Sequence, residues 1–67
     1  MDNKALIEAL RREIAQKEAE ASRLRLLSKS AADPRIRAQC ASQAKAAEAE
    51  ADLLRRRLRI FEPDYDV

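Results

Sequence analysis

The spacing of apolar and polar residues follows the period of an α-helix on both sides of an Asp-Pro pair in the middle of the chain. Asp33 is a good helix N-cap, and Pro34 is favoured at the first helical position because its missing N–H would have no partner there. Pro34 also disfavours the α conformation at Asp33, so one continuous helix would break at this point. The pattern therefore predicts a helix over residues 3–31, a turn at 32–33 and a second helix over 34–61.

Small and apolar residues recur at alternating steps of four and three in both predicted helices, which is typical of a narrow seam between packed helices. An antiparallel register with a short turn pairs large residues at the open end and small residues near the turn, where the helices must come close. The fold class is therefore all-α, an antiparallel helical hairpin over residues 1–61 followed by an acidic tail over 62–67. The predicted seam contains Ile7, Leu10, Ile14, Ala21, Leu24, Cys40, Ala44, Ala47, Ala51, Leu54, Leu58 and Phe61.

Other apolar residues fall outside this seam. A two-helix hairpin has one internal seam, and a domain of fewer than ~70 residues rarely gains more than ~3–5 kcal/mol from its core. A second apolar stripe therefore predicts an interface, used by a second copy in a four-helix bundle or by a target protein, and scattered surface leucines are the alternative explanation. The candidate partner interface contains Leu6, Leu27, Ile36, Ala46, Leu53 and Ile60.

Composition narrows the function classes. The chain has 67 residues, 46% of them hydrophobic, with no glycine, no histidine and a single cysteine. Without a histidine base, a glycine-rich phosphate loop or ligands at zinc spacing, we expect no enzyme activity, cofactor, metal or small-molecule substrate. Neither a signal peptide nor an apolar run long enough for a membrane span is found, so the predicted location is the cytoplasm, away from membranes.

The charges allow a polyanion site without indicating one. Fourteen basic and twelve acidic residues nearly balance, and the densest basic run, residues 55–59, precedes the acidic tail. Phosphate binding is one interpretation of this run, and favourable interaction with the helix dipole is the other. The candidate polyanion or rim contacts are Lys4, Arg11, Arg55, Arg56 and Arg59.

Lys17 and Tyr65 each have two interpretations. Lys17 stands at a seam position opposite Ala51. It is either a polar residue that fixes register by reaching a flanking carboxylate, or a lysine whose stem covers alanine while its ammonium stays in water. Tyr65 is a candidate contact of the tail, for which fraying is the alternative.

A chain of this length that turns at Asp33-Pro34, carries Cys40 early in its second helix and ends in an acidic tail after Phe61 resembles the plasmid copy-number Rop proteins. The resemblance implies a hairpin that dimerises into a four-helix bundle and binds paired RNA loops through a face of its first helix. Here that face would hold Lys4, Arg11 and Arg25, with Glu18 among them and no aromatic residue. The layout is also similar to small phage-encoded hairpin inhibitors and to hairpin co-chaperones of type III secretion.

The sequence thus predicts a small non-enzymatic interaction module that regulates or inhibits a target protein through an exposed helical face. Its expected partners are a second copy of itself and an unidentified protein. The alternative is a Rop-like RNA-binding regulator that uses a bundle face rich in arginine and lysine.

Overall fold

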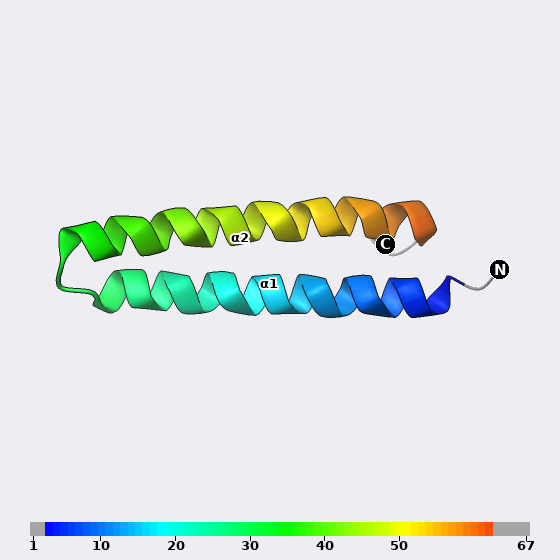
Figure 1. Ribbon diagram of the computed structural model, residues 1–67, viewed down its shortest axis with the longest axis horizontal. Coiled ribbons are helices and arrows are strands. Elements are labelled where there is room, and N and C mark those ends of the chain that lie inside the picture. The colour runs from blue at the N-terminus through cyan, green and yellow to red at the C-terminus, as the bar shows by residue number, and fades with distance from the viewer. Residues whose placement is uncertain (1–2, 63–67) are drawn as a thin grey trace.

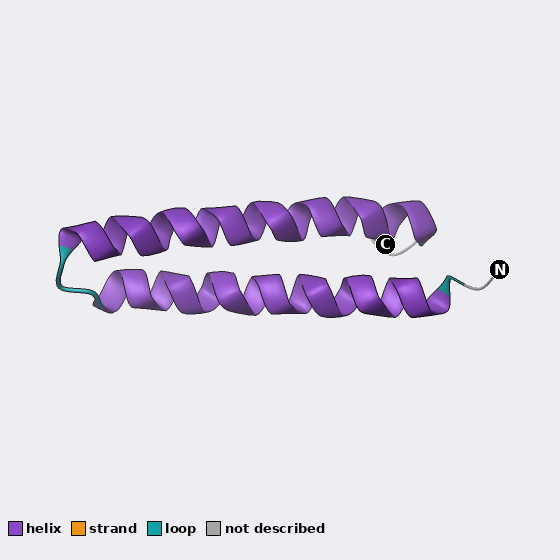
Figure 2. Cartoon of the chain, viewed as in Figure 1, coloured by secondary structure: helices purple, strands orange, loops and turns teal. Residues whose placement is uncertain are grey.

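The computed structural model describes residues 3–62, which form two long helices, α1 (Lys4–Ser30) and α2 (Pro34–Phe61), joined by a short turn. The helices run side by side in opposite directions along a molecule 51 Å long, with the start of α1 and the end of α2 opposite the turn (Figure 1). Within the described residues, everything apart from the turn and the helix-flanking residues is helical (Figure 2). The predicted all-α antiparallel hairpin is confirmed. The first helix is one residue shorter at each end than predicted, and the second has the predicted bounds.

The turn is closed by hydrogen bonds that satisfy the helix ends. The Asp33 carboxylate accepts a hydrogen bond of 2.9 Å from the Arg35 backbone N–H, which is the N-cap interaction that the sequence predicts. The Arg37 guanidinium donates two hydrogen bonds, of 3.1 and 2.9 Å, to the Ala31 carbonyl at the end of α1. The Ser28 hydroxyl donates a 2.9 Å bond to the Arg37 carbonyl. These contacts tie the last turn of α1 to the first turn of α2.

The buried residues form one seam along the hairpin. Towards the open end the seam is a cluster of large residues, Leu10, Ile14, Leu54 and Leu58, with Ile7 packed against it. Leu58 is fully buried, with 0% exposure. Towards the turn the buried side chains are the alanines 21, 44, 47 and 51. Alanine lets helix axes approach closely, so the size of the side chains follows the distance that the short turn imposes.

Four predicted seam positions are less buried than the pattern indicates. Ile7, Leu24 and Cys40 are only half-buried, and Phe61 is 38% exposed. The prediction that Phe61 lies inside the seam is wrong, and its position explains why. It is the last residue of α2, so no further turn of its own helix covers the ring.

Candidate interaction surface

The seam divides the surface of the hairpin into two long sides. With the seam residues at positions a and d of a seven-residue repeat, the residues at e from both helices line one side and those at g line the other. On α1 the e positions are 4, 11, 18 and 25, and on α2 they are 41, 48 and 55, with residue 62 continuing the register directly after the helix. The g positions are 6, 13, 20 and 27 on α1 and 36, 43, 50 and 57 on α2.

The e side carries a ladder of three ion pairs that join the helices. Arg11 Nη2 contacts both carboxylate oxygens of Glu62, at 2.7 and 2.6 Å. One heptad along α1, Glu18 pairs with Arg55, and one heptad further Arg25 pairs with Glu48.

Since the signs alternate along each helix, every rung joins opposite charges across the seam. Each rung is partly exposed, so it contributes only ~0.2–1 kcal/mol. The ladder side is defined here by the residues of these three pairs.

Arg55 belongs to a small network within the ladder side. Its Nη1 atom also donates to Asp52 Oδ1 at 2.6 Å, one turn earlier on α2. The hydrogen bond that Arg55 donates to Glu18, with the added attraction of Asp52, raises the pKa of Arg55 above its ordinary value. Arg55 is therefore held in place by carboxylates from both helices.

Lys17 leaves the seam on the opposite side. Its Nζ lies 2.7 Å from Glu50 Oε2 and 3.6 Å from Glu20 Oε2, so one ammonium joins a carboxylate of each helix. The hydrogen bond and charge of Glu50, followed by the charge of Glu20, raise the pKa of Lys17. Of the two explanations given above, the contact with a flanking carboxylate is the one that this geometry favours.

The g side of the hairpin collects most of the exposed large apolar residues. Leu6 and Leu27 occupy g positions of α1, Ile36 occupies a g position of α2, and Leu53 and Ile60 occupy neighbouring c positions of α2. Their exposures run from 44% for Leu6 to 74% for Ile60. The apolar side is defined here by the six residues of the predicted interface, Leu6, Leu27, Ile36, Ala46, Leu53 and Ile60.

The ladder side has no comparable residue. Its e positions and the adjacent b positions hold charged residues, serines and alanines. Leu26, which is 68% exposed, lies at an f position on the outer edge of α1 and belongs to neither side. The apolar residues therefore separate by side, where scattered surface leucines would occur on both.

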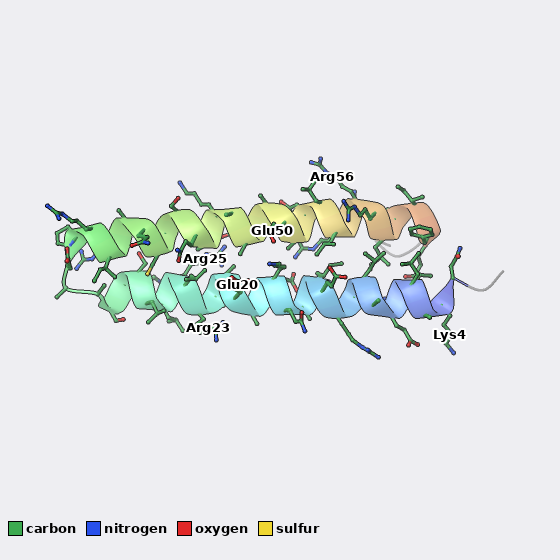
Figure 3. All side chains as sticks on the ribbon, viewed as in Figure 1. Lys4, Glu20, Arg23, Arg25, Glu50 and Arg56 are labelled. Carbon is green, nitrogen blue, oxygen red and sulfur yellow. The ribbon has the colours of Figure 1, made fainter. Side chains whose placement is uncertain are left out.

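Between its apolar ends, the apolar side is charged. A shallow depression of about 200 Å³ there is lined by Glu13, Lys17, Glu50, Leu53, Leu54 and Arg57. In Figure 3, Glu20 and Glu50 project from the facing sides of the two helices, whereas Arg23 and Arg56 point outward. Leu53 thus borders a polar centre that contains three carboxylates, those of Glu13, Glu20 and Glu50, and two cations.

Four of the five predicted polyanion contacts fall on the ladder side of the hairpin, Lys4, Arg11 and Arg55 at e positions and Arg59 at the adjacent b position, and Arg56 does not. Arg11 and Arg55 are engaged by carboxylates of the ladder side. Arg56 points away from α1 (Figure 3), and Lys4 and Arg59 also take part in interactions. Carboxylates on Arg11 and Arg55 lower the positive potential that phosphates would require. RNA binding stays a prediction.

The acidic partners of the ladder were not selected as site residues from the sequence. Glu18, Glu48 and Glu62 stand at e positions, and their heptad spacing matches that of Arg25 and Arg55. In an antiparallel hairpin the e positions of both helices lie on the same side. Comparing the e residues of the first helix with those of the second would therefore have revealed each pair.

Three further predictions concern the tail, metal binding and membranes. Tyr65, the candidate tail contact, lies outside residues 3–62. Within that range, no group of three or more histidine, cysteine, aspartate or glutamate residues is placed to hold a metal ion. Neither of the two described helices combines the length and the apolar character needed to cross a membrane.

The likeness to the Rop proteins extends to the layout of two antiparallel helices joined by a short turn. Comparisons of the chain with protein-family models, with curated proteins and with solved structures give no match.

Proposed function

We propose that this protein is a small non-enzymatic interaction module that regulates or inhibits a target protein by docking through its apolar side. The observation that supports this function is the separation of the two sides. The ladder side pairs its charges within the chain, whereas the apolar side leaves five large aliphatic side chains between 44% and 74% exposed. An apolar patch concentrated on one side of a small protein is typical of a docking surface.

Docking would proceed by helix-on-helix packing. Leu53 and Ile60 lie one heptad apart on α2, so a partner helix could bury both along one line. Burying a leucine or isoleucine side chain contributes ~1.5–3 kcal/mol. Arg57, at the neighbouring g position, would lie at the rim, where charge affects orientation and association rate more than affinity.

A capture experiment with matched variants tests this function. The wild-type chain, a Leu53→Glu/Ile60→Glu variant and a Leu26→Glu/Ala38→Glu variant are immobilised, and proteins retained from an extract of the source cells are quantified by mass spectrometry. The second variant introduces two glutamates outside the apolar side and serves as the control. Circular dichroism establishes that all three chains are equally helical.

We expect at least one protein other than the chain itself to be retained tenfold more by the wild type and the control than by Leu53→Glu/Ile60→Glu. If the apolar-side variant retains the same proteins in the same amounts, docking through this side is wrong.

A further inference from the structure

The apolar side matches a second copy of itself in size and in pattern. The hairpin measures 51 by 17 Å along its two longest axes, so one whole side of it is on the scale of the ~800 Å² that each partner contributes to a stable protein interface. Its large apolar residues lie at both ends, Leu27 and Ile36 near the turn and Leu6 and Ile60 near the open end, with charges between them. A two-fold axis places such a side on its own copy, as in most homodimers.

We propose that two hairpins pack through their apolar sides with the two-fold axis parallel to their length, so that both turns lie at the same end of a four-helix bundle. This inference rests on the proposed docking role of the apolar side, which the second copy and the target protein would occupy in turn. In this parallel arrangement, α1 of one copy lies against α2 of the other. In the antiparallel arrangement, α1 lies against α1, α2 lies against α2, and the turns lie at opposite ends.

The charges at the centre of the apolar side disfavour the antiparallel arrangement. Lys17 is the middle residue of α1, with thirteen helical residues on either side of it. Glu13 precedes it by four positions and Glu20 follows it by three, so packing α1 on an antiparallel α1 sets Glu13 of each copy opposite Glu20 of the other. Glu50 lies at the level of Lys17, to which it is bonded, and would face its own copy. Like charges in such positions are unfavourable.

The parallel arrangement brings unlike charges together instead. The level of α1 residue 17 is that of α2 residue 50, so Lys17 of one copy faces Glu50 of the other. By the same register Glu13 lies within one helical turn of Arg57 of the other copy, and the like-charge contact that remains is Glu20 within one turn of that copy's Glu50. Charge pairs at these flanking positions are what set the orientation of packed helices.

The apolar residues also match in the parallel arrangement. Leu27 of each copy lies about one helical turn from Ile36 of the other near the turns, and Leu6 lies beside Ile60 near the open ends. Each bundle end therefore closes on an apolar cluster, and the ion-paired ladder sides remain outside.

Distance measurement between the two turns distinguishes the arrangements. In a Cys40→Ser background, Ala32→Cys carries a nitroxide label at the exposed turn, and pulsed dipolar spectroscopy reads the distance between the labels of a dimer. Since neighbouring helices lie ~8–10 Å apart, the parallel dimer gives a distance below about 30 Å including the label arms. The antiparallel dimer gives a distance close to the 51 Å length of the hairpin and would overturn the proposal.

A charge reversal gives a second, independent readout. Glu13→Arg places like charges against Arg57 of the other copy in the parallel dimer, but relieves the conflict with Glu20 in the antiparallel one. We expect the dissociation constant of the dimer to rise at least threefold, whereas Glu8→Arg, the same change on the ladder side, leaves it within twofold. A fall in the dissociation constant for Glu13→Arg would contradict the parallel arrangement.

A chain that is monomeric at every concentration would overturn the second copy as the partner. The capture experiment then separates the two proposals. If retention of another protein still depends on Leu53 and Ile60, the docking function stands and the dimer alone is rejected. If neither readout responds to Leu53→Glu/Ile60→Glu, both proposals are rejected.

Discussion

The ladder side and the apolar side belong to the same two helices but differ in whether their side chains have partners within the chain. On the ladder side, three interhelical ion pairs at heptad spacing leave arginines and glutamates facing one another. On the apolar side, large aliphatic residues extend into solvent at both ends of the hairpin. The ladder side forms its ion pairs within a single chain. The apolar side contributes to stability only when another surface covers it and removes its side chains from water.

Both sides depend on the seam, and breaking the seam has the largest expected effect. Leu58 is fully buried in the cluster of large residues at the open end. Leu58→Ala would lower the free energy of unfolding by ~2–5 kcal/mol, because it removes buried methyl groups and leaves a cavity. Urea denaturation followed by circular dichroism measures the loss.

The exposed Leu26 provides the control for that measurement. Leu26→Ala removes the same atoms from a residue that is 68% exposed and is expected to change stability by less than ~0.5 kcal/mol. Equal losses for the two variants would contradict the burial described for Leu58.

Reversing one rung tests the ladder side alone. Glu18→Arg replaces the carboxylate that Arg55 contacts with a like charge, and we expect it to destabilise the hairpin by up to ~1 kcal/mol. Combining it with Arg55→Glu restores an opposite-charge pair and should recover part of the loss. A double-mutant cycle measured by thermal denaturation at low salt gives the coupling. Independent, additive effects would show that this rung contributes nothing.

The two sides are also expected to differ in their dependence on salt concentration. Raising sodium chloride from about 50 to 500 mM screens exposed charge pairs, so the Glu18–Arg55 coupling should shrink while association through the apolar side changes little. The RNA alternative predicts a different response, because binding through several phosphate contacts weakens by orders of magnitude over this range. Measuring self-association and binding to a structured RNA in the same salt series discriminates the two functions.

The smallest expected effect is the pH dependence at Lys17. Glu50 raises the folded-state pKa of Lys17 above its ordinary value of 10.5. The stability from this pair is therefore fully present below pH 10.5 and is lost as pH rises through the higher folded-state pKa.

The melting temperature of the wild type minus that of Lys17→Met should fall as pH rises through the folded-state pKa of Lys17. Other titrating groups are shared by both chains and cancel in the difference. A difference that stays constant from neutral to strongly alkaline pH would mean that the Lys17–Glu50 contact does not stabilise the fold.

Much of the fold was predictable because local signals agree with one another. The Asp33-Pro34 pair predicts the end of one helix and the start of the next, and the four-three spacing predicts which residues are buried. Phe61 shows the limit, since a periodic pattern does not reveal that this residue ends its helix and has no further turn of α2 to cover it.

The candidate site was predictable only in part. The six residues of the apolar side follow from spacing, because residues outside the seam of a two-helix hairpin must face outward. The ladder was missed because its pairs join residues far apart in sequence, such as Arg11 and Glu62, and become visible only with both helices in one register. The direction taken by Lys17 depended likewise on carboxylates of both helices.

Light scattering behind a sizing column, over a concentration series, tests the central claim about the two sides most directly. We predict that the wild-type chain and Glu18→Arg shift from the mass of a monomer to that of a dimer as concentration rises, while Leu53→Glu/Ile60→Glu stays monomeric with unchanged helical content. A wild-type chain that never dimerises, or a dimer lost in Glu18→Arg and retained in Leu53→Glu/Ile60→Glu, would contradict it.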